Sequence, residues 1–312
     1  MAPTLDPPVH GLRPRLRRLL HSIAGGTAVG LLRMLRLTNR KRTADIVGAI
    51  LRRLGPLLPE HRIGRANLSA AFPDMPAEEI ERILSSVWDN LGRVAVEFPH
   101  LDRLVLQASA DDIDAGDDVI YDETVAARFI AARERMPAVF FTAHLANWEI
   151  PALMAAQFDV PMNVLFRPPS LPAIRDAILK IRSKSMGTLV PASFAAPLQL
   201  ARAMENGQSV AMLVDQHDST GIDVVFFGRT CKANSLLAQL ARHFDCPVRG
   251  VRIVREADGN SFRFCLTEPL DVPRDAEGKV DVARTMQLIT SVVEGWVREH
   301  PEQWLWLHRR WR

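Results

Sequence analysis

The chain has 312 residues with a formal net charge of +3, 47% hydrophobic residues and 24% charged residues. This composition is typical of a globular protein and excludes a largely disordered chain, and the length allows one large α/β domain with a smaller appendage. The three cysteines lack C-x-x-C spacing, which argues against a zinc ribbon or a disulfide scaffold and favours a reduced compartment.

The amino-terminal region, residues 1–54, is predicted to be a basic amphipathic arm that associates with a membrane. Residues 1–53 contain eleven Lys or Arg against two Asp or Glu, whereas the rest of the chain contains 28 against 34. The uncharged window between Arg18 and Arg33 is fourteen residues long, which is short for a hydrocarbon core of about 30 Å. We therefore expect an interfacial helix on anionic lipid. A signal peptide and a basic helix packed on the domain are the alternatives.

The periodicity of apolar residues predicts helices up to residue 100 and an α/β pattern after it. Helices are expected at 43–54 and from about 75 to 96. Later, strands alternate with helices, which predicts a mixed, largely parallel sheet flanked by helices. The expected strands are 138–143, 162–167, 188–190, 209–215 and 248–255, and the expected helices are near 147–157, 172–186, 196–206, 234–244 and 280–299.

Two further strands, 223–227 and 261–267, are expected near an edge of this sheet. The predicted organisation is therefore an arm over residues 1–54 and a second domain over 55–312. That domain comprises a helical lead-in, 55–100, and an α/β core, 101–312.

The most informative motif begins at His144 and ends at Glu149. It follows the apolar strand 138–143, so His144 is expected at the carboxyl end of a strand, and Asn147 is the expected N-cap of the next helix. A strand–turn–helix connection can fold His144 and Glu149 back toward one another. A carboxylate bonded to one ring nitrogen makes the other nitrogen a better base. A single His…Glu pair also arises often by chance.

Two other predicted strands end in ionisable residues. Strand 162–167 ends at Arg167, and strand 209–215 ends at Asp215, which Gln216 follows. Ligands bind at the carboxyl ends of strands in open α/β sheets, so these side chains are expected to converge with His144. Taken singly, Arg167 is equally explained as a surface arginine and Asp215 as a loop cap.

Several kinds of chemistry lack their motifs in this sequence. There is no G-x-S-x-G, no phosphate-binding G-x-x-x-x-G-K-[ST], no G-x-G-x-x-G and no H-E-x-x-H, and the nine histidines are scattered. We therefore expect no metal and no cofactor. A base, an orienting carboxylate and a nearby cation suit the deprotonation of a substrate alcohol with stabilisation of an oxyanion.

The motif His144-x-x-x-x-Glu149 resembles the HxxxxD/E motif of the glycerolipid acyltransferase superfamily. More of the chain is similar to one branch of it, the late (lauroyl/myristoyl-type) lipid A biosynthesis acyltransferases. The matching blocks run in order from about residue 55 to 312, and they are 67–73, 88–93, 142–149, 166–168, 215–216, 226–228 and 300–310.

The resemblance implies an O-acyltransferase on the cytoplasmic face of a bacterial inner membrane. Its donor would be acyl carrier protein, and its acceptor would be a hydroxyl on a 3-hydroxyacyl chain of a lipid A precursor. By carry-over, His144 is the general base and Glu149 its partner. Residues near the reacting groups that are expected to bind substrate or the oxyanion are Arg167, Asp215, Asn147 and Gln216.

The expected partners are acyl carrier protein, the lipid A precursor and anionic membrane lipid. No nucleic acid is expected to bind. The terminal aromatic and basic residues are expected to pack at an interface and face phosphates: Trp304, Trp306, Trp311, Arg309, Arg310 and Arg312. Ordinary core packing is the alternative for the three tryptophans. Three other functions remain open: transfer to another lipid acceptor (a lysophospholipid, an ornithine lipid or a glycolipid), a thioesterase, and a membrane-binding scaffold with a decayed site.

Overall fold

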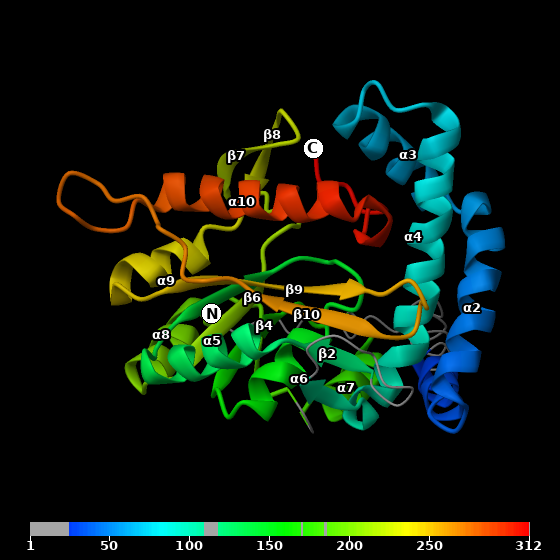
Figure 1. Ribbon diagram of the computed structural model, residues 1–312, viewed down its shortest axis with the longest axis horizontal. Coiled ribbons are helices and arrows are strands. Elements are labelled where there is room, and N and C mark those ends of the chain that lie inside the picture. The colour runs from blue at the N-terminus through cyan, green and yellow to red at the C-terminus, as the bar shows by residue number, and fades with distance from the viewer. Residues whose placement is uncertain (1–24, 109–117, 170, 184–185, 312) are drawn as a thin grey trace, which may run out of the picture.

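A computed structural model describes residues 25–108, 118–169, 171–183 and 186–311, and Figure 1 shows its arrangement. The first half of the predicted arm, residues 1–24, lies outside the described residues. No helix in the described part of the chain is both long enough and apolar enough to cross a bilayer. Residues 25–35 are helical. The membrane association of the arm and its boundary at residue 54 remain predictions.

The centre of the molecule is an eight-stranded sheet in the order β1-β2-β10-β9-β3-β6-β4-β5. All pairings are parallel except that of β9 with β10, so the predicted mixed, largely parallel sheet is confirmed. In that order the strands are Leu106–Ala108, Val119–Tyr121, Phe262–Leu266, Val248–Arg255, Val139–Thr142, Ser209–Leu213, Met162–Phe166 and Thr188–Pro191.

The prediction that strands 223–227 and 261–267 lie near an edge of the sheet is wrong. Strand β10, which corresponds to 261–267, lies between β2 and β9, because the short strands β1 and β2 extend the sheet beyond it. Strand β7 (Ile222–Phe226) pairs with β8 (Arg229–Ala233) in a separate two-stranded sheet. Strands β1, β2 and β8 were not predicted.

Helices cover both faces of the large sheet (Figure 1). On one face, α8 (Ala196–Glu205), α9 (Leu236–Phe244) and α10 (Val282–Glu299) pack on alternate strand residues such as Phe141 and Met212. On the other face, α5 (Glu123–Glu134) and α6 (Ile150–Gln157) pack on Phe140 and its neighbours. Helix α7 (Pro172–Arg182) follows β4.

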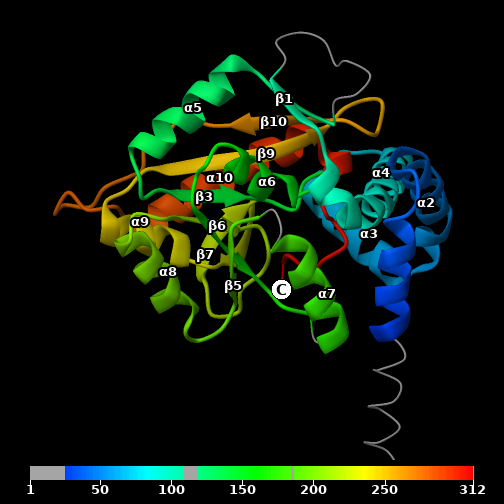
Figure 2. The same ribbon diagram turned by 90° about the horizontal axis from the view of Figure 1, so that it is seen from below.

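The helical lead-in stands at the end of the sheet toward which β9 points (Figure 1). It contains α3 (Pro59–Ala71) and α4 (Ala77–Glu97), and α2 (Arg40–Leu54), which belongs to the predicted arm, packs along α4. Short 3₁₀ helices lie at Gly55–Leu57, Phe98–Arg103 and Pro301–Gln303. Figure 2 shows this group of helices beside the carboxyl ends of the central parallel strands, where the site lies.

Candidate active site

His144 and Asp215 meet because two neighbouring parallel strands are in register. Thr142 of β3 pairs with Leu213 of β6. His144 and Asp215 each lie two positions beyond this pair, just past the end of their own strand. The Val214 N–H donates to the Thr142 carbonyl (3.1 Å), which extends the pairing toward the site. Both residues therefore leave the sheet side by side, as expected from their predicted places at strand ends.

The carboxylate of Asp215 is buried and fully hydrogen-bonded. Its Oδ1 lies 2.8 Å from His144 Nδ1, and its Oδ2 accepts the backbone N–H of His144 (2.8 Å) and the indole N–H of Trp304 (2.7 Å). Burial alone would raise the pKa of Asp215, but the charge and hydrogen bonds of His144 outweigh it and hold this pKa well below its usual value. An ionised acceptor at Nδ1 leaves the lone pair of His144 on Nε2.

Nε2 of His144 faces outward beside Gln216, whose Nε2 lies 3.3 Å away. The ring is only 12% exposed, and the Trp148 ring lies 5.2 Å from it between centroids. The turn that carries His144 is held from the carboxyl terminus, because the Leu305 N–H donates to the His144 carbonyl (3.1 Å). The base is thus oriented by a buried carboxylate, and its other nitrogen faces the exposed side-chain amide of Gln216.

Glu149 does not orient His144, so that part of the prediction is wrong. Its carboxylate accepts two hydrogen bonds from Arg182 of α7, at 2.8 and 2.5 Å. The guanidinium of Arg182 lies between the Phe98 and Phe166 rings, 5.6 and 5.7 Å from their centroids. Glu149 instead ties the start of α6 to the end of α7. Any catalytic role of Glu149 stays a prediction.

Asn147 is fully buried and bonded within the protein, and its expected contact with substrate stays a prediction. Its Nδ2 donates to Glu97 (2.9 Å), and Glu97 is in turn paired with Arg255 (3.0 Å). Asn147 is also not the N-cap of α6, because Glu149 occupies that position without a side-chain cap. The amide fixes the turn after His144 by accepting the Glu149 N–H (3.2 Å).

A polar hollow with a cavity volume of about 250 Å³ adjoins His144 on the side of Gln216. Arg167 lies in it at the end of β4, as expected from its strand-end position. The hollow is lined by Arg167, Gln216, His217, Asp218, Ser219, His308 and Arg309. It brings Arg167 and Gln216, two of the predicted substrate-binding residues, to one wall of the site.

His308 is a second histidine of the site that sequence reasoning did not single out. Its ring centroid lies 6.5 Å from that of His144, and its Nδ1 donates to the Leu305 carbonyl (2.5 Å). Burial lowers the pKa of His308, so the ring is neutral with a lone pair on Nε2. That Nε2 is buried without a hydrogen-bond partner among the described residues. It is available to accept an N–H or O–H of a substrate.

An apolar hollow with a cavity volume of about 50 Å³ extends from Trp148, whose ring lies 5.2 Å from that of His144, toward α5. Trp148 and Thr142 line it next to the base, and Phe129 and Val251 line it farther away. A single alkyl chain suits such a lining, because it has almost no polar surface to satisfy.

A family model described as bacterial lipid A biosynthesis acyltransferase matches residues 14–312. The chain belongs to this family. The protein is therefore an acyltransferase, as its motifs implied. Its family serves lipid A biosynthesis. Comparison with curated proteins found no match.

The blocks that carried the family resemblance meet around the acyltransferase site. Asn90 donates to the Ala146 carbonyl (3.1 Å), and Asn67 donates to the carbonyls of Trp306 and His308 (2.8 Å each). Trp304 and Trp306 are fully buried, so for these two residues the core alternative is confirmed. Arg182 was missed because only the fold brings it to Glu149. Trp304 and His308 lie in the last matching block, which was the available signal for them.

Proposed function

We propose that this acyltransferase moves a fatty acyl chain from acyl carrier protein to a hydroxyl of a 3-hydroxyacyl chain on a lipid A precursor, by direct general-base catalysis. The observation that carries the proposal is the Asp215–His144 pair, whose Nε2 faces Gln216 at the polar hollow, with an apolar hollow at the neighbouring Trp148. An acyl transfer needs this combination: a base for the alcohol, space for the alkyl chain and polar groups for the reacting carbonyl.

In the proposed reaction, Nε2 of His144 removes the proton of the acceptor hydroxyl as its oxygen attacks the thioester carbonyl. The resulting oxyanion collapses with cleavage of the C–S bond, and the imidazolium returns its proton to the departing thiolate. Asp215 stabilises the imidazolium while it exists. Arg167 and Gln216 are proposed to stabilise the oxyanion and orient the hydroxyl, because both line the polar hollow beside the base.

The apolar hollow beside Trp148 is the proposed place of the transferred chain. It begins next to His144, where a thioester carbonyl must lie for attack, and it leads away from the polar hollow. The donor's polar arm and the acceptor's headgroup are then left to the polar side. We also propose that the enzyme works at the cytoplasmic face of the inner membrane, where its basic arm contacts anionic lipid.

The test is transfer by the purified full-length enzyme from acyl carrier protein thioester to a lipid A precursor. His144→Ala is expected to lower the rate by roughly 10³-fold or more, and Asp215→Asn by roughly 10²- to 10⁴-fold, with both proteins folded. His243→Ala is the matched control, because His243 is exposed on α9 and outside both hollows.

Substantial transfer by His144→Ala would contradict the mechanism. Faster turnover of a lysophospholipid, an ornithine lipid or a glycolipid would contradict the proposed acceptor. Free fatty acid released at the transfer rate without any acceptor would indicate a thioesterase, because water would then replace the alcohol.

A further inference from the structure

The loop between β5 and α8 presents a fully exposed aromatic ring. Phe194 has a relative exposure of 105%, and Leu198, one helical turn later, has 57%. Residues 186–201, which contain both side chains, include no charged residue. Isolated exposed apolar residues are common on protein surfaces, but an uncharged run with its largest side chain at the tip is not.

The tip is held in place by hydrogen bonds on both sides. The Ala192 N–H donates to the Phe166 carbonyl (2.8 Å), which continues the pairing of β4 with β5. The Ala196 N–H donates to the Ser193 carbonyl (3.1 Å) across the tip. Phe194 is therefore projected by a defined turn, and no other aromatic ring of the described residues is paired with it.

This loop leaves the sheet at the same edge as the catalytic groups. β5 is parallel to β4 and β4 is parallel to β6, so the carboxyl end of β5 lies at the edge where Arg167 and Asp215 leave their strands. A surface that contacts Phe194 is therefore also close to the mouth of the site.

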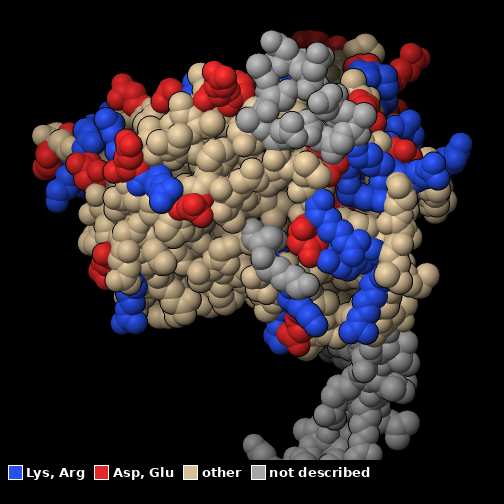
Figure 3. Space-filling model, turned by 60° about the horizontal axis from the view of Figure 1, so that its bottom comes forward, with Lys and Arg blue, Asp and Glu red and all other residues tan. Residues whose placement is uncertain are grey.

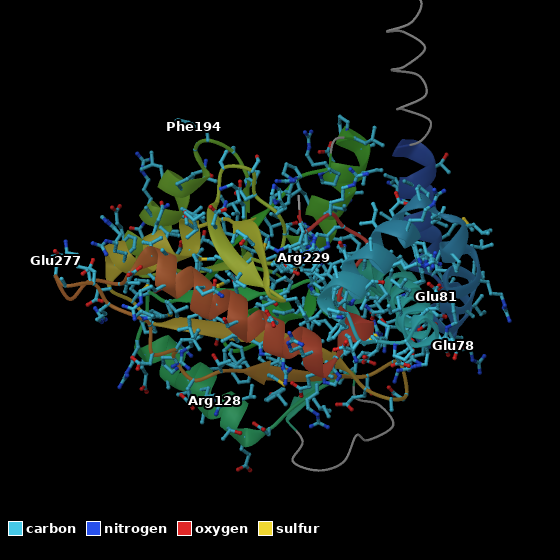
Figure 4. The ribbon with its side chains drawn as sticks, turned by 90° about the horizontal axis from the view of Figure 1, so that it is seen from above. Glu78, Glu81, Arg128, Phe194, Arg229 and Glu277 are labelled. Carbon is cyan, nitrogen blue, oxygen red and sulfur yellow. The ribbon has the colours of Figure 1, made fainter. Side chains whose placement is uncertain are left out.

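The loop also lies on the same side of the molecule as the amino-terminal helix. Figure 4 shows Phe194 and the start of helix 25–35 at the top, with Arg128 of α5 at the bottom, and Figure 2 shows the same two elements together from another direction. Between them lies α7, which carries Lys180 beside a hollow lined also by Arg33 of the amino-terminal helix. Figure 3 shows that the surface of the molecule combines a wide area with few charged side chains and, to its right, a cluster of Lys, Arg, Asp and Glu.

We propose that the β5–α8 loop is a second membrane contact, with Phe194 and Leu198 inserted into the interfacial region of the bilayer. The proposal rests on the membrane association proposed above, and it adds where the catalytic domain itself meets the bilayer. Apolar rings flanked by Lys and Arg at headgroup level are the chemistry that a membrane interface accepts. Two contacts on one side would hold the mouth of the site against the surface from which a lipid acceptor arrives.

The first experiment measures the depth of residue 194 directly. Phe194→Cys in the full-length protein is labelled with an environment-sensitive fluorophore and mixed with phosphatidylcholine–phosphatidylglycerol vesicles. Burial raises the pKa of the three natural thiols, that of Cys246 to about 12, so they react slowly. Ile130→Cys on α5 is the control, because Ile130 is apolar and exposed (58%) and Arg128 of the same helix lies on the side opposite Phe194 (Figure 4).

The expected result is a blue shift and increased emission at position 194 and no change at position 130. An unchanged spectrum at position 194, while the protein sediments with the vesicles, would overturn the proposal. It would leave the amino-terminal arm as the contact.

The second experiment compares vesicle affinities of the full-length variants. Phe194→Asp is expected to weaken binding roughly tenfold, since a partly buried Phe side chain is replaced by a charge, and Ile130→Asp is expected to leave binding unchanged. Both substitutions are at exposed positions, so the midpoint of thermal unfolding reports that both variants fold. Equal affinity of Phe194→Asp and wild type would overturn the proposal. Both readouts are independent of acyl transfer, so failure of the proposed reaction would be seen separately.

Discussion

At the scale of single residues, the largely buried pair of Glu149 and Arg182 is expected to contribute strongly to stability. Both side chains are largely buried, at 8% and 17% exposure, and the guanidinium binds both carboxylate oxygens. Glu149→Gln is expected to lower the free energy of unfolding by about 3 kcal/mol, because it leaves a buried cation without its counter-ion. Chemical denaturation measures this.

The matched control for that substitution is Glu79→Gln. Glu79 accepts two hydrogen bonds from Arg82 at the same distances, 2.8 and 2.5 Å, but the two side chains are 38% and 67% exposed. Solvent screens an exposed pair, so little change in stability is expected. Equal losses from both substitutions would mean that the contact between α6 and α7 is not a stabilising element of the fold.

His308 is expected to make the stability of the protein depend on pH. Its pKa is lowered in the folded state, chiefly by burial, while the unfolded chain binds a proton below about pH 6.5. The unfolded state therefore binds more protons there, and stability falls as the pH drops through and below 6.5. His308→Asn, whose amide can still donate to the Leu305 carbonyl, is expected to remove this component.

Denaturation near pH 7.5 and near pH 5.5 tests the expectation for His308. The difference in stability between these two conditions should be smaller in His308→Asn than in the wild type. His243→Asn, at an exposed position on α9, serves as the control. An identical pH dependence in the wild type and His308→Asn would show that His308 is protonated alike in the folded and unfolded states.

At the scale of elements, the crossing of α2 and α4 depends on two glycines. A Cβ placed on Gly92 would lie 2.9 Å from the Gly48 Cα and 2.9 Å from the Val47 carbonyl oxygen, closer than real contacts allow. Gly92→Ala is therefore expected to force the helices apart and to lower stability by about 1–3 kcal/mol. Thermal or chemical unfolding measures the loss.

Gly295→Ala on α10 is the matched control for this crossing. A Cβ there meets nothing within 4 Å, so the better helix propensity of alanine is expected to raise stability by about 0.5–1 kcal/mol. Opposite signs for the two substitutions would confirm that α2 packs directly on α4. A stabilising Gly92→Ala would contradict that packing.

Strands with long apolar runs were predicted well, whereas β1, β2, β8 and the helix α5 were missed. β3, β4, β5, β6 and β9 lie within a residue or two of their predicted bounds. β1 and β2 have three residues each, which is too short for a period of two to emerge. Because β1 and β2 pair beyond β10, β10 is not an edge strand. The sequence of residues 261–267 does not indicate which strands will be its neighbours.

At the scale of the whole molecule, the uneven charge of the chain predicts how it meets a membrane. The first 53 residues contain eleven Lys or Arg against two Asp or Glu, and the remainder has an acidic excess. Binding to phosphatidylglycerol vesicles is therefore expected to weaken as salt rises toward about 0.5 M, since added salt screens the attraction to anionic headgroups. Sedimentation with vesicles measures it.

Replacement of Arg13, Arg15, Arg17 and Arg18 by Gln is expected to reduce this salt-dependent component. Vesicles of phosphatidylcholine alone are the control, because they offer no net anionic surface. Equal, salt-insensitive binding to both kinds of vesicle would contradict the role assigned to the basic arm.

The sequence by itself determined the fold class, the family and the place of the base. Each rests on local information: a β-branched run before His144, alternating strands and helices, and ordered blocks of residues. These features can be recognised without knowing which strands are neighbours. The expected convergence of Arg167 and Gln216 near the base also followed from a rule about strand ends.

Only the tertiary structure decided which carboxylate serves His144. Glu149 is five residues away in the chain but turns to Arg182, whereas Asp215, 71 residues away, is brought opposite by the pairing of Thr142 with Leu213. Register between strands is set by hydrogen bonds and core packing over the whole sheet. For that reason, only the folded structure shows the partner of the base. The same holds for the burial of Asn147 and the unpaired Nε2 of His308.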